Sequence, residues 1–261
     1  MKFYIVLIVT IFSSFTLAYG QDAPNKTDAA GKKQGHWIKY DDSHKKKYEG
    51  NFVNDIPVGK FTYFYDTGIP WSISVFSDNG KVTRTQMFGA GGKLSGEGKY
   101  VNEKKDSVWK FYDQEGKFVA DEIYVNGLKN GNCKVYFQSG QVAEEKVWKD
   151  GVPDGIWKKY FESGDLKYSG QHINGKVEGK IVLYQASGKI DAEGLYKNDL
   201  KDGPWKYYNE DGSLKRTDVY INGRMQGGDK NIITKEELEK QKEKFQQFEL
   251  KDPYQDNYKG E

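Results

Sequence analysis

Eight consecutive blocks of 24 residues run from Gly35 to Gln226 without an insertion or a deletion. The sixth position of every block is aromatic, and the twentieth is always Asn or Asp. A fixed period of this length is typical of an array of small, similar structural units. Such arrays offer extended surfaces, whereas enzymes gather unusual residues in one place. The repeat therefore favours a binding or structural role.

Turn residues divide each block into two short segments. Glycine occupies the tenth position in seven blocks, with His44 in its place in the first, and Asn-Gly or Asp-Gly follows the second segment in four blocks. Glycine supplies the left-handed conformation of a three-residue hairpin loop, and Asn-Gly favours a two-residue turn with positive φ. Each block therefore predicts one β-hairpin. The array predicts an all-β fold: an elongated single antiparallel sheet, a meander of about sixteen strands.

Rows of aromatic residues recur at the third and sixth positions of the blocks. These positions differ in parity, so they lie on opposite faces of a regular strand unless a bulge intervenes. The twelfth and eighteenth positions share parity and are expected on one face. Aromatic rows either stabilise a thin sheet or receive a partner. The candidate binding residues are Trp37, Tyr40, Trp109, Tyr112, Tyr136, Trp157, Tyr160, Tyr184, Trp205 and Tyr208.

Residue patterns typical of catalysis and metal binding do not occur in the sequence. Two of the three histidines, His36 and His44, lie in the first block and His172 in the sixth, and Cys133 is the single cysteine, so no zinc-site spacing appears. No phosphate-binding glycine loop and no Gly-x-Ser-x-Gly motif occur either. We expect no enzyme activity, no cofactor and no metal. Cys133 replaces a tryptophan and His172 an aromatic residue of the repeat, so both are expected to be structural. The net charge of +2 predicts no nucleic-acid partner.

The chain begins with features of a signal peptide. Lys2 precedes an apolar stretch, and Ala18-Tyr19-Gly20 suits cleavage before Gln21. The alternative is a membrane anchor, but the stretch is short and contains Ser and Thr residues. Residues 1–20 therefore predict export to the periplasm or the medium. Residues 21–34 are polar and predict a flexible leader.

The pattern ends after the eighth block. Thr234 and Glu237 form a capping box, and the residues from Lys235 to Glu249 lack Gly and Pro. Within residues 227–261 we therefore expect a short helix that caps the last hairpin, followed by a mobile tail. Such a cap would protect the open end of a sheet.

The recurring Gly-x-Trp-x-x-Tyr, a gap to Gly, and Gly-x-Tyr-x-Asn-Gly resemble the MORN repeat, in the bacterial variant often called a YwqK-type antitoxin. The resemblance covers Gly35 to Gln226 and is weakest in the third block, where Thr83 and Thr85 replace Gly and Trp. It implies hairpins in one elongated sheet and roles in protein or lipid association. It implies no reaction.

Together these features predict a non-catalytic, exported repeat protein that binds a protein partner of the envelope or outside the cell, along one aromatic-rich face. A carbohydrate- or cell-wall-binding protein is the first alternative, because aromatic rings stack on sugars. An antitoxin-like protein or a structural scaffold is another. Apolar side chains on both faces also predict possible self-association.

Overall fold

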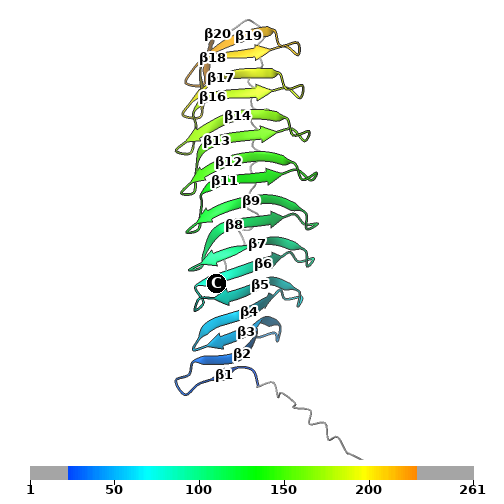
Figure 1. Ribbon diagram of the computed structural model, residues 1–261, viewed down its shortest axis with the longest axis vertical. Helices are drawn as coiled ribbons and strands as arrows, with labels where there is room; N and C mark the ends of the chain where they lie inside the picture. The colour runs from blue at the N-terminus through cyan, green and yellow to red at the C-terminus, as the bar shows by residue number, and fades with distance from the viewer. Residues whose placement is uncertain (1–22, 228–261) are drawn as a thin grey trace, which may run out of the picture. The chain divides into compact units, whose positions relative to one another are not determined.

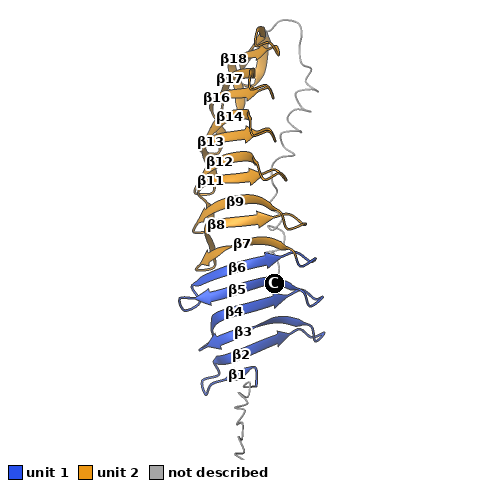
Figure 2. Ribbon diagram, turned by 45° about the vertical axis from the view of Figure 1, so that its right-hand side comes forward, with its two compact units in different colours: residues 1–92 blue, residues 93–261 orange. Residues whose placement is uncertain are grey.

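A computed structural model describes residues 23–227 of the chain. These residues fall into two compact units, unit 1 (residues 23–92) and unit 2 (residues 93–227), which Figure 2 colours separately. The expected signal peptide, helix and tail lie outside the described residues. Within residues 23–227 the structure contains strands and turns and no helix, so no helix there could span a bilayer.

Unit 1 is an antiparallel meander in which each strand pairs with the next along the chain. A two-residue strand, β1, lies in the segment that its composition predicts to be a flexible leader. There the Trp37 Nε1 donates a hydrogen bond to the Lys26 carbonyl at 3.1 Å. The leader is therefore partly ordered by contact with the first block. The strands are β1 (Lys26–Thr27), β2 (Lys33–Tyr40), β3 (Lys46–Val53), β4 (Ile56–Phe64), β5 (Pro70–Ser77) and β6 (Val82–Phe88).

Unit 2 continues the same design as a row of antiparallel hairpins in chain order (Figure 1). The sixteen predicted strands correspond to β2–β19, two of them interrupted as β10/β11 and β15/β16, while β1 and β20 are additional. The strands of unit 2 are β7 (Leu94–Val101), β8 (Lys104–Tyr112), β9 (Phe118–Val125), β10 (Leu128–Lys129), β11 (Gly131–Tyr136), β12 (Val142–Lys149), β13 (Val152–Tyr160), β14 (Leu166–Ile173), β15 (Lys176–Val177), β16 (Gly179–Tyr184), β17 (Ile190–Lys197), β18 (Leu200–Tyr208), β19 (Leu214–Ile221) and β20 (Arg224–Gly227).

Both predicted turns are confirmed. In the first turn, the Gly164 N–H donates to the Phe161 carbonyl at 2.9 Å. Gly164 has φ of +92°, and His44, which replaces this glycine in the first block, has φ of +61°. In the second turn, Asn174 and Gly175 have φ of +50° and +86°. Two successive positive φ values define the two-residue turn that matches the twist of a hairpin.

A β-bulge follows the first turn of the hairpins and corrects one expectation. Lys159 pairs with Tyr168 and Tyr160 with Leu166, which leaves Lys167 as the extra residue. The same shift occurs in the other hairpins described within one unit. One extra residue reverses the parity of the strand. The expectation that the twelfth and eighteenth positions share a face is therefore wrong: the twelfth lies with the sixth.

The core forms where a large side chain at the third position of a block packs on a glycine of the preceding hairpin. A Cβ on Gly194 would lie 2.4 Å from the Trp205 ring, and one on Gly98 would lie 2.3 Å from the Trp109 ring. Trp205 and Trp109 are 2% and 0% exposed. The ring lies so close to the glycine backbone that no methyl group would fit between them. The ring and the glycine therefore form one packing unit.

A pair of hydroxyl side chains replaces this packing unit between β5 and β6 of unit 1. At the equivalent positions Ser74 and Thr85 face each other, and their hydroxyls lie 2.9 Å apart. Both residues are buried, and Ser72 extends the hydroxyl chain. The strands of the third block, β6 and β7, belong to different units. The division therefore falls in the block where the repeat pattern is weakest.

Candidate binding face

The aromatic residues predicted to bind do not form one surface. In β8, Trp109 and Tyr112 are three residues apart and point to opposite sides of the sheet. We call the side with Trp109 and the packed glycines the core face, and the side with Tyr112 the open face. The candidate tryptophans belong to the core face and the candidate tyrosines to the open face.

Side chains of the protein itself cover the tryptophans of the core face. The Lys201 Nζ lies 4.0 Å from the centre of the Trp205 ring, and the Lys105 Nζ lies 4.9 Å from that of Trp109. Such cation–π contacts stabilise the packed rings. Burial lowers the pKa of Lys201 to about 8. The faces of these two buried indoles are therefore not open to a ligand.

The other two candidate tryptophans are half-buried and hold structural contacts. The Trp157 Nε1 donates to the Glu144 carboxylate at 2.6 Å, and its ring lies 4.8 Å from that of His172. Trp37, in unit 1, donates to two backbone carbonyls, those of Lys26 and Gln34. These contacts favour a structural role for the tryptophans.

A row of half-buried tyrosines crosses the open face of unit 2. We call it the tyrosine row, and it consists of Tyr112, Tyr136, Tyr160, Tyr184 and Tyr208. Four of the five donate a hydrogen bond from the phenol to a carboxylate of the preceding hairpin: Tyr112 to Glu97 at 2.8 Å, Tyr136 to Asp121 at 3.0 Å, Tyr160 to Glu145 at 3.2 Å and Tyr208 to Glu193 at 2.8 Å.

These bonds fix the phenols and affect their ionisation. Burial, followed by the hydrogen bond to Glu97, raises the pKa of Tyr112 to about 12. Burial, followed by the hydrogen bond to Asp121, likewise raises the pKa of Tyr136 to about 12. A phenol pKa that is higher in the folded than in the unfolded chain means that the neutral phenol stabilises the folded state. This contribution to folding stability is complete below pH 10 and is lost as the pH rises through about 12. Tyr112 and Tyr136 are therefore neutral, oriented hydrogen-bonding groups over a broad pH range.

Lysines and apolar side chains complete the row. Lys180 pairs with Glu193 at 2.8 Å and Lys134 with Glu145 at 3.3 Å, so these carboxylates are neutralised within the face. Phe118, which the bulge places on this side, has its ring 5.8 Å from Tyr112 and 4.8 Å from Tyr136. The resulting surface combines aromatic rings, phenol hydroxyls and balanced charges.

Tyr40 holds the same repeat position in unit 1, where it is 51% exposed. It belongs to β2 and not to the tyrosine row of unit 2.

An exposed aliphatic surface lies on the open face beside the tyrosine row, and the sequence reasoning missed it. Its residues share the face with the tyrosines because, along β8 and β13, they precede a tyrosine by four residues. The signal was the recurrence of Val, Ile and Leu at the second, seventeenth, nineteenth and twenty-second positions. We call it the aliphatic strip: Val108, Val125, Leu128, Val152, Ile156, Ile173, Leu195, Leu200, Val219 and Ile221.

Three further polar features of the described residues lie outside the tyrosine row and the aliphatic strip. No group of three or more His, Cys, Asp or Glu side chains within residues 23–227 converges as metal ligands would. A pocket of about 180 Å³ beside Lys201 is lined by Asp191, Lys215 and Arg216 among others. Cys133 is buried as expected, and burial raises its thiol pKa.

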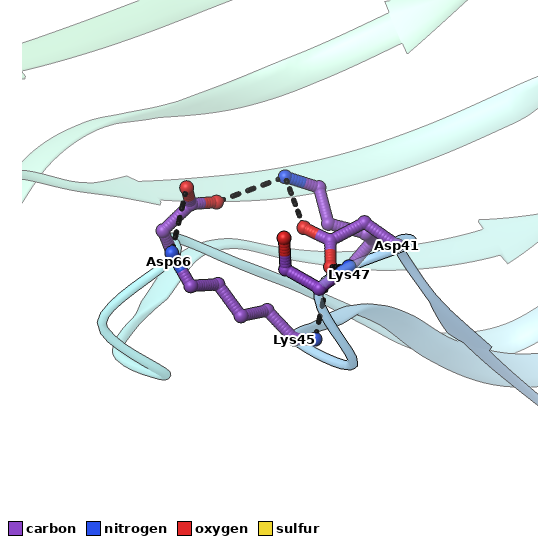
Figure 3. A network of polar contacts seen from close by, with 5 residues as sticks. Asp41, Lys45, Lys47 and Asp66 are labelled. Carbon is purple, nitrogen blue, oxygen red and sulfur yellow. Dashed lines mark hydrogen bonds and ion pairs between the residues drawn. The ribbon is translucent and has the colours of Figure 1, made fainter.

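A charged network joins two turns in unit 1 (Figure 3). Asp66 contacts Lys45 at 3.3 Å and Lys47 at 3.0 Å, and Lys47 also approaches Asp41 at 4.0 Å. The hydrogen bond from Lys47 holds the pKa of Asp66 below its usual value. The side chains are well exposed, so solvent screens the network. It connects neighbouring turns without forming a site.

The repeat geometry agrees with a comparison against protein families. The model of the MORN repeat variant matches residues 129–150, 153–174, 177–198 and 201–222. The four matched segments are consecutive and follow the 24-residue period. They begin where the second turn of one hairpin ends, and they include most of the tyrosine row. The resemblance inferred from the residues is confirmed there, while the narrower YwqK-type assignment stays a prediction. A search of curated proteins gave no significant match.

Proposed function

We propose that the protein is a non-catalytic, exported scaffold that binds a protein partner across the tyrosine row of unit 2. The proposal rests mainly on the four phenols that are hydrogen-bonded to carboxylates on an otherwise open face. Fixed tyrosines provide contact area at low entropic cost, and tyrosine is enriched in the residues that dominate binding energy. The balanced charges beside them provide orientation more than affinity.

A protein partner is favoured over a glycan by the position of the indoles. Stacking on sugars would require open ring faces, whereas Trp109 and Trp205 are packed on glycines and covered by lysines. A purely structural scaffold accounts for the core face but does not require the ordered phenols of the open face.

The binding proposal is tested by affinity capture of the tagged full chain from its own cells. The double variant Tyr136→Ala and Tyr160→Ala is expected to retain at least about tenfold less of the captured partner, because two anchoring side chains are lost. Tyr40→Ala, at the same repeat position in unit 1, is the matched control and should retain it. Equal capture by both variants, or retention on cell-wall glycan alone, would overturn the proposal.

Export is tested separately. The signal peptide proposed for residues 1–20 predicts a mature protein that starts at Gln21 and accumulates outside the cytoplasm. Amino-terminal sequencing of the fractionated protein decides this, and a cytoplasmic protein that retains Met1 would contradict it.

A further inference from the structure

The aliphatic strip is separate from the tyrosine row. Along β13, Ile156 precedes Tyr160 by four residues, which places the two side chains roughly 13 Å apart on the same face. The relation of Val108 to Tyr112 in β8 is the same. A partner bound to the tyrosine row therefore need not cover the strip, and the strip requires its own explanation.

The composition of the strip is that of a core rather than of a transient interface. Its members are all Val, Leu or Ile, and each is 41 to 55% exposed. Surfaces that bind unrelated proteins rely on aromatic and Arg anchors with a polar rim. Homodimer interfaces are more apolar and resemble a domain core cut in half. In its composition the strip resembles a homodimer interface.

The size of the strip suits an interface between two copies. Burying one such side chain completely removes roughly 60–120 Å² from water, so ten half-exposed ones present on the order of 450 Å². A standard interface buries about 800 Å² per partner, of which about 65% is apolar in homodimers. The strip therefore comes close to supplying the apolar part of a stable dimer interface.

The charges beside the strip have both signs. Exposed lysines interrupt the rows of the strip, Lys149 and Lys197 at the nineteenth position and Lys176 at the twenty-second. The carboxylates of Asp154 and Glu178 accept backbone N–H bonds from the next hairpin at 3.2 and 2.8 Å. A surface with both signs can complement a second copy of itself, whereas a surface with one sign would repel it. Long lysine stems also bury their methylenes while the ammonium groups reach water.

We propose that a second copy of this chain covers the aliphatic strip, so that two open faces pack sheet on sheet through their aliphatic halves. Sheets that pack face to face lie about 10 Å apart with interdigitating side chains. The face of one sheet can meet that of another across several strands, whereas one helix would contact only part of the strip. The tyrosine rows remain outside the region of contact.

The test measures the mass of the full chain in solution by light scattering over a wide range of concentrations. The wild-type protein is expected to reach twice the monomer mass. The double variant Val152→Thr and Ile156→Thr keeps β-branched residues in the strand, and it is expected to raise the dimer dissociation constant at least about tenfold. Leu214→Thr is the matched control, because Leu214 is a 55% exposed aliphatic residue of unit 2 outside the strip.

A dimer that Leu214→Thr preserves and the double variant weakens supports the proposal. A wild-type protein that stays monomeric at all concentrations overturns it, as does a dimer that the strip variant leaves unchanged. A heterologous protein or a lipid vesicle that binds the strip of a monomeric chain would also overturn it. The Tyr136→Ala and Tyr160→Ala variant should still dimerise, so failure of the dimer and failure of partner binding are distinguishable.

Discussion

At the scale of single residues, the contact between a ring and a glycine determines how neighbouring hairpins pack. Phe61 packs on Gly50, and Ile181 packs on Gly170, in the same way as the tryptophans pack on their glycines. Where the glycine is replaced, the contact changes although the tryptophan is kept: the Nζ of Lys146, at the glycine position, lies 5.0 Å from the centre of the Trp157 ring. The two positions therefore act as a pair, and neither can be understood alone.

The contact between glycine and ring predicts how one added methyl group changes the stability of the protein. Gly194→Ala would place a Cβ 2.4 Å from the Trp205 ring, so the ring or the backbone must shift. We expect the free energy of unfolding to fall by about 1–3 kcal/mol, measured by chemical denaturation. Gly91→Ala is the control, because no atom lies within 4 Å of its Cβ position, and it should stay within about 0.5 kcal/mol of wild type. Equal stabilities of the two variants would contradict the packing argument.

His172 predicts a dependence of stability on pH. It is 7% exposed, and its Nδ1 has no hydrogen-bond partner among residues 23–227. Burial, and then the charge of Lys146, lower its pKa below the ordinary value of 6.5. The unfolded chain therefore binds the proton more readily than the folded protein does. The contribution of neutral His172 to the free energy of unfolding is complete above pH 6.5 and is lost as the pH falls through the lowered pKa.

This dependence can be removed by one substitution. His172→Phe restores the aromatic residue that the other blocks carry, and it should reduce the loss of unfolding free energy between pH 7 and pH 5. Denaturant titrations of both proteins at each pH provide the measurement. If the two proteins lose the same stability on acidification, His172 is not the group responsible.

At the scale of the hairpin, the turns and the bulge decide which side chains share a face. The first turn needs a left-handed residue, and His44 adopts φ of +61° without the freedom of glycine. The bulge after this turn moves Phe118 to the open face, where it packs between two tyrosines. The composition of the open face is thus a consequence of one extra residue per hairpin.

The strain at His44 can be relieved. Most L-residues disfavour this conformation, so His44→Gly is expected to stabilise the protein by about 0.5 kcal/mol or more, despite the greater freedom of glycine in the unfolded chain. The reverse change at an equivalent turn, Gly212→Ala at φ of +91°, is expected to destabilise it by about 1 kcal/mol. Thermal unfolding of both variants checks the signs, and a destabilised His44→Gly protein would refute the argument.

At the scale of the whole molecule, each hairpin contacts its neighbours within its unit, so stability should be close to a sum over adjacent blocks. Unit 2 contains a direct test of this idea. Gly170 and Gly194 hold the same position in successive blocks, and Trp205 packs on the second of them. Removing the block between them would bring Gly170 under Trp205.

Deletion of residues 179–202 is therefore expected to give a folded, all-β protein that unfolds cooperatively at somewhat lower denaturant concentration. Deletion of residues 179–190, half a block, is the control and should abolish cooperative unfolding, because it disrupts the pairing of strands and the sequence of turns. Circular dichroism with denaturant titration distinguishes them. Two deletions with the same behaviour would show that the period does not define the unit of folding.

The sequence by itself determined the all-β class, the hairpin of each block and both turns, because these depend on local backbone preferences that Gly164 or Asn174-Gly175 express in a few residues. It also placed the third and sixth positions on opposite faces. The tertiary structure alone decided which aromatic residues remain accessible, since Trp109 is buried against a glycine of the neighbouring strand and is covered by Lys105 of its own strand. It likewise decided that one extra residue moves Phe118 to the open face and that an aliphatic strip lies beside the tyrosines. Burial and bulges result from contacts between strands, which no single block encodes.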